Sequence, residues 1–535
     1  MGIPETGCLL GRFPGRLEPC GNVRSRQMSA GGFAATEPGL LSRSHFMSDY
    51  SRKNCPVSCG AVFCREGSAL LIFRRFSDII PYNKFVYPTE EDIKMSTDLQ
   101  TLIGKGQFSC RCGKCHSAGF SRVMIGSGVT AEVPDVLESY GTGKVFILAD
   151  RNTYRAAGER VTAELDKAGI AHTVFLLPGE GRAEPDERAV GSAVMHFDPS
   201  CDTVLGIGSG VINDIGKIIS SLTGRQYVIY GTAPSMDGYA SGTSSVIRDG
   251  LKLSLTTRVA DTVIGDTDVL AAAPMRMILS GLGDMIAKYI SIAEWKISNI
   301  INGEYYCDTV ASLVTDGLNE CMENLDGIPS RDKSSIAAVM NGMVLSGIAA
   351  NYAGVTRPVS GMEHYLSHIC DMRAAEFGTH SDLHGIQCGA ATIECLKIYE
   401  KLRSVTPDCE KALEYAAAFS YDSWKEKLRR WLGNGAEAMI ANEAREHKYD
   451  KTKHRERLDR IIGSWDSIQS VIRQLPLPSE IVPGLRKIGL PTSFAEIGFT
   501  EEETKNAVLF SRDVRDKYVG SRLMWDLGII DEIVG

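Results

Sequence analysis

Four of the ten histidines fall within 21 residues, at His364, His368, His380 and His384. On a helix, His364 and His368 lie one turn apart on the same face, so both can enter one cleft. An Asp with two His, such as Asp284 with His364 and His384, is a three-ligand set that leaves a position for substrate, as catalytic metal sites require. His364 with His368 and one other ligand is a competing set. A pair of surface histidines without a metal is the third interpretation.

A glycine-rich turn, Gly206 to Asp214, directly follows the predicted strand Thr203 to Leu205 and opens a predicted helix that runs to Ser220. Glycines at a strand-to-helix turn let backbone N–H groups approach a pyrophosphate, whose charge the helix N-terminus stabilises. The spacing is not the standard GxGxxG, and a tight structural loop is the alternative. The turn therefore suggests a dinucleotide site without establishing one.

Two further segments end predicted strands with polar residues. The loop Gly231 to Ser241 follows the apolar strand Tyr227 to Tyr230 and holds small hydroxyl residues and one carboxylate, Asp237. Asp150 follows the strand Lys144 to Ala149. Such positions suit a ligand at the C-terminal edge of a parallel sheet. A loop stabilised by its own hydrogen bonds and a solvated turn residue are the alternatives.

The elements that must position these residues divide the chain into parts. From Val123, short apolar runs alternate with amphipathic helices, which predicts a doubly wound parallel sheet. After about Asp266 the strands stop and helical spacing takes over, for example in 275–297, 306–324, 334–350 and 385–402. We expect a poorly ordered extension over 1–94, a Rossmann-like domain over 95–265 and a helical domain over 266–535. A Pro-rich turn is expected over 475–483.

Composition limits the function classes. The 535 residues are 43% hydrophobic and 23% charged, a composition typical of globular proteins. The net charge of −8 gives no general electrostatic attraction for nucleic acid. We find no apolar run long enough to span a bilayer and no signal peptide at the start. The 15 cysteines are odd in number and mostly scattered, as expected for reduced thiols. We expect a cytoplasmic protein that has no membrane span and binds no nucleic acid.

Five motifs, taken in chain order, are similar to those of one family. They are the turn Gly208 to Asp214, the loop Ser235 to Ser241, the helix Gly281 to Lys288, the element Glu363 to His368, and His384-Gly385. Together they resemble sn-glycerol-1-phosphate dehydrogenases, within the superfamily of glycerol dehydrogenase, iron-containing alcohol dehydrogenases and dehydroquinate synthase. The resemblance runs from about Met95 to the C-terminus, where Trp525 to Gly528 looks like the bacterial, AraM-like branch.

The resemblance implies NAD(P)-dependent interconversion of dihydroxyacetone phosphate and sn-glycerol 1-phosphate. It also implies one divalent metal (nickel or zinc, with iron as a further choice) and a homodimer. The residues that it assigns are Asp284, His364 and His384 to the metal, His368 and Asp237 to the substrate, and Asp150, Gly208, Ser209, Gly210, Val211, Ile212, Thr232, Ala233, Pro234, Ser235 and Ser241 to the dinucleotide. The alternatives are a glycerol or polyol dehydrogenase and a dehydroquinate-synthase-like lyase.

A separate constellation, Cys110-Arg111-Cys112-Gly113-Lys114-Cys115-His116, precedes the first strand of the predicted sheet. It satisfies the C-x-x-C-H pattern of covalent c-type haem and has ligand types suited to zinc. A reduced, cysteine-rich hairpin is the third interpretation. An electron carrier or nucleic-acid module built on this cluster is the function class most different from a dehydrogenase, and the acidic balance of the chain argues against nucleic acid.

Overall fold

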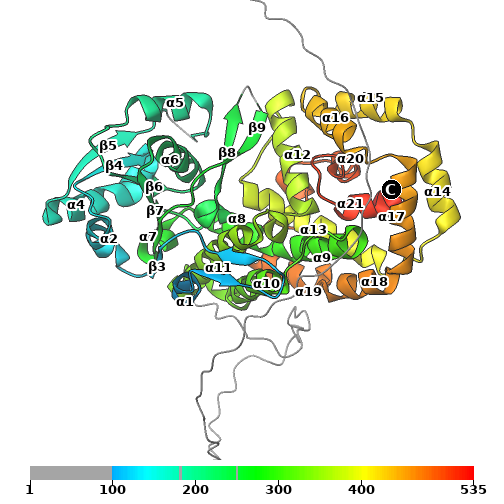
Figure 1. Cartoon of the computed structure of the whole chain (residues 1–535), viewed down its shortest axis with the longest axis horizontal. Coiled ribbons are helices and arrows are strands. Elements are labelled where there is room, and N and C mark those ends of the chain that lie inside the picture. The colour runs from blue at the N-terminus through cyan, green and yellow to red at the C-terminus, as the bar shows by residue number, and fades with distance from the viewer. Residues whose placement is uncertain (1–98, 180–182, 249–250) are drawn as a thin grey trace, which may run out of the picture. The chain divides into compact units, whose positions relative to one another are not determined.

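The computed structural model describes residues 99–179, 183–248 and 251–535. The extension expected over 1–94 lies outside the described residues. A six-stranded parallel sheet lies in the N-terminal part of the described chain (Figure 1). Its strand order is β3-β10-β7-β6-β4-β5. Its strands are β3 (Arg122–Gly126), β4 (Lys144–Ala149), β5 (Ala171–Leu176), β6 (Thr203–Gly208), β7 (Gln226–Gly231) and β10 (Thr262–Asp266).

Helices cover both faces of the sheet. Successive strand residues point to opposite faces, and because these strands are largely apolar, each face must be buried against helices. Val145 and Ile147 of β4 pack with α2 (Val133–Ser139) and α4 (Glu159–Ala168). Phe146 and Leu148 belong instead to the core that contains α5 (Glu187–Met195) and α6 (Gly210–Thr223). This double covering confirms the predicted fold class. Short helices α1 (Leu99–Gly104) and α3 (Arg151–Thr153) complete this half.

Two antiparallel hairpins accompany the parallel sheet. One pairs β1 (Gln107–Ser109) with β2 (Cys115–Ser117), where a cysteine-rich hairpin is one of the expectations. The other pairs β8 (Thr243–Arg248) with β9 (Leu251–Thr256) and is absent from the predicted elements. The dipeptide Asp249-Gly250 is the sequence signal that could have predicted this second hairpin, because Asp-Gly favours two-residue hairpin turns.

Residues 267–535, all of which the structure describes, are helical and contain no strand. The helices that carry or surround the predicted site are α7 (Thr267–Ala272), α8 (Met275–Ile286), α9 (Lys288–Asn302), α10 (Asp308–Glu323), α11 (Lys333–Ala353), α12 (Met362–Phe377) and α13 (His384–Leu402). The C-terminal helices are α14 (Cys409–Ala418), α15 (Tyr421–Leu432), α16 (Gly435–Glu446), α17 (Lys451–Gly463), α18 (Trp465–Gln474), α19 (Pro478–Lys487), α20 (Glu501–Ser511), α21 (Gly520–Asp526) and α22 (Ile530–Val534).

Two expected elements differ from the structure. The segment 275–297, where helical spacing was expected, is helical but divides into α8 and α9, which meet at Ala287. The Pro-rich turn expected over 475–483 is limited to its first residues, since α19 begins at Pro478. Proline is tolerated in the first helical turn, where its missing N–H has no intrahelical partner to lose. Pro483 lies inside the same helix.

One helix in the described part of the chain, α11, is long and apolar enough to cross a bilayer. It has 21 residues and a mean hydropathy of 1.3, and 78% of its most apolar window is buried within the protein. Met340, Met343 and Val344 of α11 are fully buried in the core. Burial of this extent is typical of the central helix of a helical domain.

Candidate metal centre

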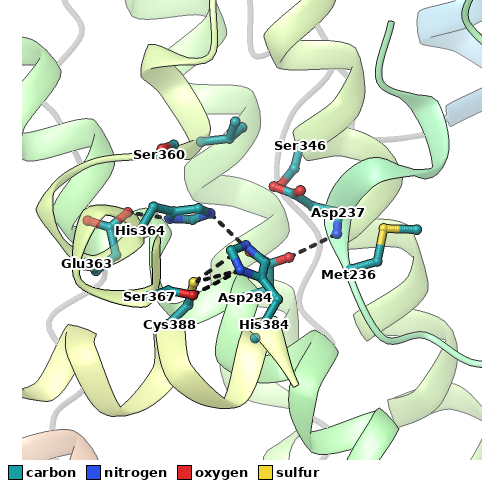
Figure 2. A network of polar contacts seen from close by, with 12 residues as sticks. Met236, Asp237, Asp284, Ser346, Ser360, Glu363, His364, Ser367, His384 and Cys388 are labelled. Atoms are coloured by element: carbon teal, nitrogen blue, oxygen red, sulfur yellow. Dashed lines mark hydrogen bonds and ion pairs between the residues drawn. The ribbon is translucent and has the colours of Figure 1, made fainter. Parts of the chain in front are cut away.

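Three helices bring Asp284, His364 and His384 together (Figure 2). Asp284 lies near the end of α8, His364 near the start of α12, and His384 is the first residue of α13. His364 Nε2 is 3.5 Å from Asp284 Oδ1, and the two imidazole rings are 5.1 Å apart between centroids. Asp284 and His364 are buried and His384 is half-buried. The three side chains therefore converge although up to a hundred residues separate them in sequence.

Small residues in the sequence motifs make this convergence geometrically feasible. A Cβ on Gly283 would lie 2.1 Å from the carbonyl oxygen of Gly385, and a Cβ on Gly385 would lie 1.8 Å from that of Ser280. Because backbone atoms cannot yield at such distances, only glycine lets α8 and α13 approach this closely. The two glycines adjoin Asp284 and His384 in sequence. Their close packing thus sets the separation of the two side chains.

Both imidazoles are oriented by a neighbour. His364 Nδ1 lies 2.8 Å from Oε1 of Glu363, and His384 Nδ1 lies 3.0 Å from the hydroxyl oxygen of Ser367. Metal-binding histidines commonly use one ring nitrogen for such a contact, which fixes the ring and leaves the other nitrogen for the metal. Here each Nδ1 is engaged, so each Nε2 is left for the centre of the cluster.

The other two histidines of the sequence cluster behave differently. His380 is exposed on 66% of its side chain, and its nearest ionic partner is Asp382 at 3.9 Å, so it lies outside the cluster. His368 is half-buried, and its ring stacks on that of His384 with 6.2 Å between centroids. His368 therefore lies beside the cluster without belonging to its converging donors.

Lys288 contacts this cluster, although the sequence analysis assigned it no role. It is fully buried, and its ammonium donates to Asp284 Oδ1 at 3.1 Å, to Asp237 Oδ2 at 2.6 Å and to the Val359 carbonyl at 3.1 Å. Burial alone would lower the pKa of Lys288, but the two carboxylates raise it above its usual range, so the side chain is charged. Its position four residues after Asp284 was the available signal.

Cys388 is a second donor that sequence reasoning missed. It lies one turn after His384 on α13, and its Sγ is 3.6 Å from His384 Nε2. The potential ligand atoms of Asp284, His364, His384 and Cys388 all lie within 4.8 Å of one another. A cysteine four residues after a predicted ligand on a helix was the available signal.

The charges of the cluster suit a cation. Burial by itself would lower the pKa of His364, but Cys388, Asp284 and Glu363 outweigh burial and raise it well above its usual range. Burial would likewise raise the pKa of Asp284, but Lys288 and the two histidines push it below its usual range. A divalent cation can take the place of the proton that these imidazoles otherwise hold, and carboxylate and imidazole are donor types that bind divalent transition metals.

The predicted phosphate-binding turn lies at the C-terminal edge of the sheet. Gly208 ends β6 and α6 begins at Gly210, with Ser209 between them. A Cβ on Gly208 would lie 2.4 Å from Cγ1 of Ile212, so the turn has no room for a side chain there. Val211 is half-buried and Ile212 is buried. The fourteen-residue α6 therefore points its N-terminus at this edge.

Asp150 lies next to this turn, since β4 pairs with β6 and places Ala149 opposite Ile207. Oδ1 of Asp150 accepts hydrogen bonds from the backbone N–H groups of Asn152 and Thr153 at 2.7 and 2.9 Å. Asp150 also lines a cavity of about 490 Å³ together with Leu177, Pro178, Asp186, Arg188 and neighbouring residues. Its carboxylate is thus both a helix cap and part of a cavity wall.

The loop after β7 joins the sheet edge to the cluster of potential metal ligands. Thr232, Ala233 and Ser235 are buried, and Ser280 Oγ donates to the Ser235 carbonyl across 2.9 Å. The Pro234 carbonyl oxygen occupies the space that a Cβ on Gly281 would need, at 2.0 Å. Ser241, at the end of the loop, is half-buried, and its hydroxyl oxygen is 2.8 Å from that of Thr243.

The fold and the site together are typical of a class of dehydrogenase with two parts. One part is a parallel sheet of the kind that binds dinucleotides, and the other is a helical part that holds a cluster of potential metal ligands. Residues 124–274 match the sequence profile of a family described as iron-containing alcohol dehydrogenase. Among solved structures, a 1,3-propanediol oxidoreductase shares the fold with a TM-score of 0.51 and 12% identity, over 77% of this chain and 98% of the other.

The chain belongs, more particularly, to the glycerol-1-phosphate dehydrogenase [NAD(P)+] family. The enzyme of that name from Halalkalibacterium halodurans is 33% identical over 294 residues, which cover 54% of this chain and 74% of the relative. The Bacillus licheniformis enzyme of the same name is 27% identical over 441 residues, which cover 82% of this chain and 97% of the relative.

Proposed function

We propose that this protein interconverts dihydroxyacetone phosphate and sn-glycerol 1-phosphate with NAD(P)(H) and a divalent metal. The observation that carries the proposal is the continuity of the loop after β7 with the metal cluster. The backbone N–H of Asp237 donates to Asp284 Oδ2 across 2.9 Å, so a loop that starts at the dinucleotide-type edge ends against a predicted metal ligand. A substrate between them can meet both cofactor and metal, which metal-assisted hydride transfer requires.

In this proposal Asp284, His364 and His384 bind the metal. Glu363 and Ser367 fix the orientation of the two imidazole rings through their contacts with each Nδ1. A divalent metal bound there supplies Lewis acidity that polarises the C2 oxygen of the substrate. Lys288 balances the charge of Asp284 and Asp237. Three protein ligands leave a position for substrate, the usual arrangement of a catalytic metal site.

His368 and Asp237 would face the substrate. His368 lies one helical turn after His364, and its ring stacks on that of His384, so it can hold or pass on the hydroxyl proton without binding the metal. Asp237 is 22% exposed and its Oδ2 is engaged by Lys288. An aspartate fixed in this way can accept a hydrogen bond from a substrate hydroxyl.

The dinucleotide would lie along the sheet edge, over residues 95–265, with residues 266–535 supplying the metal site. Gly208 to Ile212 would hold the pyrophosphate at the N-terminus of α6. Asp150 would lie near the ribose, and Thr232 to Ser235 with Ser241 would line the side toward the metal. We further propose nickel or zinc as the metal, with iron as the alternative, and a cytoplasmic homodimer.

The test combines elemental analysis with a substrate comparison. NADH oxidation is assayed with dihydroxyacetone phosphate, dihydroxyacetone and glyceraldehyde 3-phosphate, and the chirality of the glycerol phosphate is determined. We expect a strong preference for dihydroxyacetone phosphate and the sn-1 product. A preference for dihydroxyacetone would indicate a polyol dehydrogenase instead. Conversion of a substrate without net change in NADH would indicate a lyase related to dehydroquinate synthase.

A further inference from the structure

The β1–β2 hairpin brings a second group of metal-ligand types together, apart from the residues of the catalytic centre. Cys110 and Cys112 lie in the turn between the strands, His116 lies on β2, and Cys307 directly precedes α10. Their potential ligand atoms all lie within 4.8 Å of one another. Nearly two hundred residues separate the hairpin from Cys307, so tertiary packing alone creates the group.

The distances match the edges of a zinc tetrahedron. Zinc–sulfur bonds of ~2.3 Å and a zinc–nitrogen bond of ~2.0 Å put two sulfurs ~3.8 Å apart and a sulfur and a nitrogen ~3.5 Å apart. Cys110 Sγ is 3.7 Å from Cys307 Sγ. His116 Nε2 is 3.3 Å from Cys112 Sγ and 3.6 Å from Cys307 Sγ. These cysteines are not joined by disulfides.

The imidazole of His116 is oriented for a metal. The side chain is fully buried, and Nδ1 donates to the Tyr352 carbonyl oxygen across 2.7 Å. This contact leaves the lone pair of Nε2 facing the three sulfurs, the arrangement in which a backbone carbonyl fixes a ligand histidine. The Tyr352 ring stacks on the imidazole with 5.3 Å between centroids, which holds the ring plane.

The surroundings support thiolates. The Tyr305 hydroxyl lies 3.3 Å from Cys112 Sγ, and the Thr309 hydroxyl lies 3.5 Å from Cys110 Sγ, so each can donate to a sulfur. The ammonium of Lys114 lies 3.5 Å from the centroid of the Tyr305 ring. Three thiolates with one divalent cation carry a net charge of −1, which this nearby ammonium offsets.

The remaining cysteine of the motif is excluded by strand geometry. Cys115 and His116 are neighbours on β2 and therefore point to opposite faces. Cys115 is exposed, and its Sγ is 3.7 Å from the hydroxyl of Ser109 rather than near the other sulfurs. A c-type haem would need Cys112 and Cys115 on the same side, so the C-x-x-C-H pattern does not describe a haem site here.

We propose that Cys110, Cys112, Cys307 and His116 bind a structural zinc ion. Binding releases the thiol protons of the three cysteines to solvent and involves no change in oxidation state. Four protein ligands leave no position for substrate, so the ion is structural rather than catalytic. The ion fastens the hairpin to Cys307, directly before α10, and the hydrogen bond from His116 to the Tyr352 carbonyl oxygen joins the hairpin to the end of α11. The inference is independent of the reaction proposed above.

The test is zinc content of the full-length protein, purified from zinc-supplemented cells, dialysed against chelator and measured by elemental analysis and native mass spectrometry. We expect one zinc ion per chain that Cys112→Ser and Cys307→Ser lose. Cys115→Ser is the matched control and should keep it. His384→Ala should also keep it, because that substitution touches only the other centre. The proposal is wrong if the His384→Ala protein contains no zinc. It is also wrong if Cys115→Ser loses zinc as Cys112→Ser does.

A second measurement does not depend on whether the cysteine variants fold. X-ray absorption at the zinc edge of the His384→Ala protein should give a shell of three sulfurs at ~2.3 Å and one nitrogen. A zinc shell of nitrogen and oxygen alone would overturn the assignment. Removal of zinc with a mercurial reagent should lower the melting temperature of the protein. Once the mercurial has been removed from the cysteine thiols, added zinc should restore the melting temperature.

Discussion

Lys288 Nζ lies 2.6 Å from Asp237 Oδ2 and so joins α9 to the loop that follows β7. The same ammonium contacts Asp284, which makes one buried cation common to the sheet side and the helical side of the site. The two carboxylates would otherwise repel each other in a low-dielectric setting. Lys288 therefore stabilises the contact between the loop after β7 and Asp284 of α8, where the substrate is proposed to bind.

Substitution of the proposed ligands should remove the metal. Asp284→Asn, His364→Ala and His384→Ala are each expected to lose bound metal at the catalytic centre and nearly all turnover, because each removes one of three ligands. Circular dichroism should show the helical fold intact. His380→Ala is the control, since His380 is exposed and outside the cluster. If His380→Ala loses the metal while His384→Ala keeps it, the assignment is wrong.

Cys388 offers a sharper test of ligand number. We expect Cys388→Ser to keep the catalytic metal and most activity, because a catalytic site needs a coordination position for substrate. Metal content and turnover are measured side by side with His384→Ala. Loss of metal on substitution of Cys388 would mean four protein ligands, and the position of the substrate would have to be revised.

Removal of the buried ammonium should destabilise the fold. Lys288→Met leaves Asp284 and Asp237 without their cation, and breaking a buried ion pair typically costs about 3–5 kcal/mol. The free energy of unfolding in urea is the measurement. Lys397→Met is the matched control, because the Lys397–Glu394 pair is exposed and such pairs contribute about 0–1 kcal/mol. Equal losses in the two variants would contradict the role given to Lys288.

The phosphate-binding turn is tested by adding one methyl group. Gly208→Ala forces Ile212 away, which should destabilise the protein by about 1–3 kcal/mol and weaken NAD(P)H binding measured by fluorescence titration. Gly191→Ala is the control, since a Cβ on this helical residue would meet nothing within 4 Å. Alanine there should leave cofactor binding unchanged and raise stability by up to ~1 kcal/mol. Unaltered cofactor affinity in Gly208→Ala would remove this turn from the cofactor site.

His368 is expected to relay a proton without holding the metal. A positioned acid–base group contributes ~100-fold to 10,000-fold to rate, so His368→Ala should reduce kcat within that range. Metal content and cofactor affinity should remain near wild type. Loss of metal would make His368 a ligand. A rate that matches wild type from pH ~6 to ~9, the span around the ordinary histidine pKa, would end the relay hypothesis.

Local patterns in the sequence were sufficient for the fold class. Short apolar runs predict the strands, and apolar residues at helical spacing predict the helices between them. The predicted strand Lys144 to Ala149 has the same bounds as β4. The helix predicted after the glycine-rich turn runs three residues further than expected, to Thr223, where Gly224 ends it in a left-handed conformation. Such features depend on neighbours along the chain, which is why they can be predicted from the sequence.

The membership of the two metal-ligand groups was decided by tertiary structure. His380 and His384 are equivalent in type and close in sequence, yet the packing of Gly283 against Gly385 brings only His384 to Asp284. Cys115 belongs to the cysteine motif, yet strand alternation turns it outward and distant Cys307 takes its place. Residue type and spacing determine which atoms can bind a metal. Which of them meet depends on contacts between segments far apart in the chain, and no local period records those contacts.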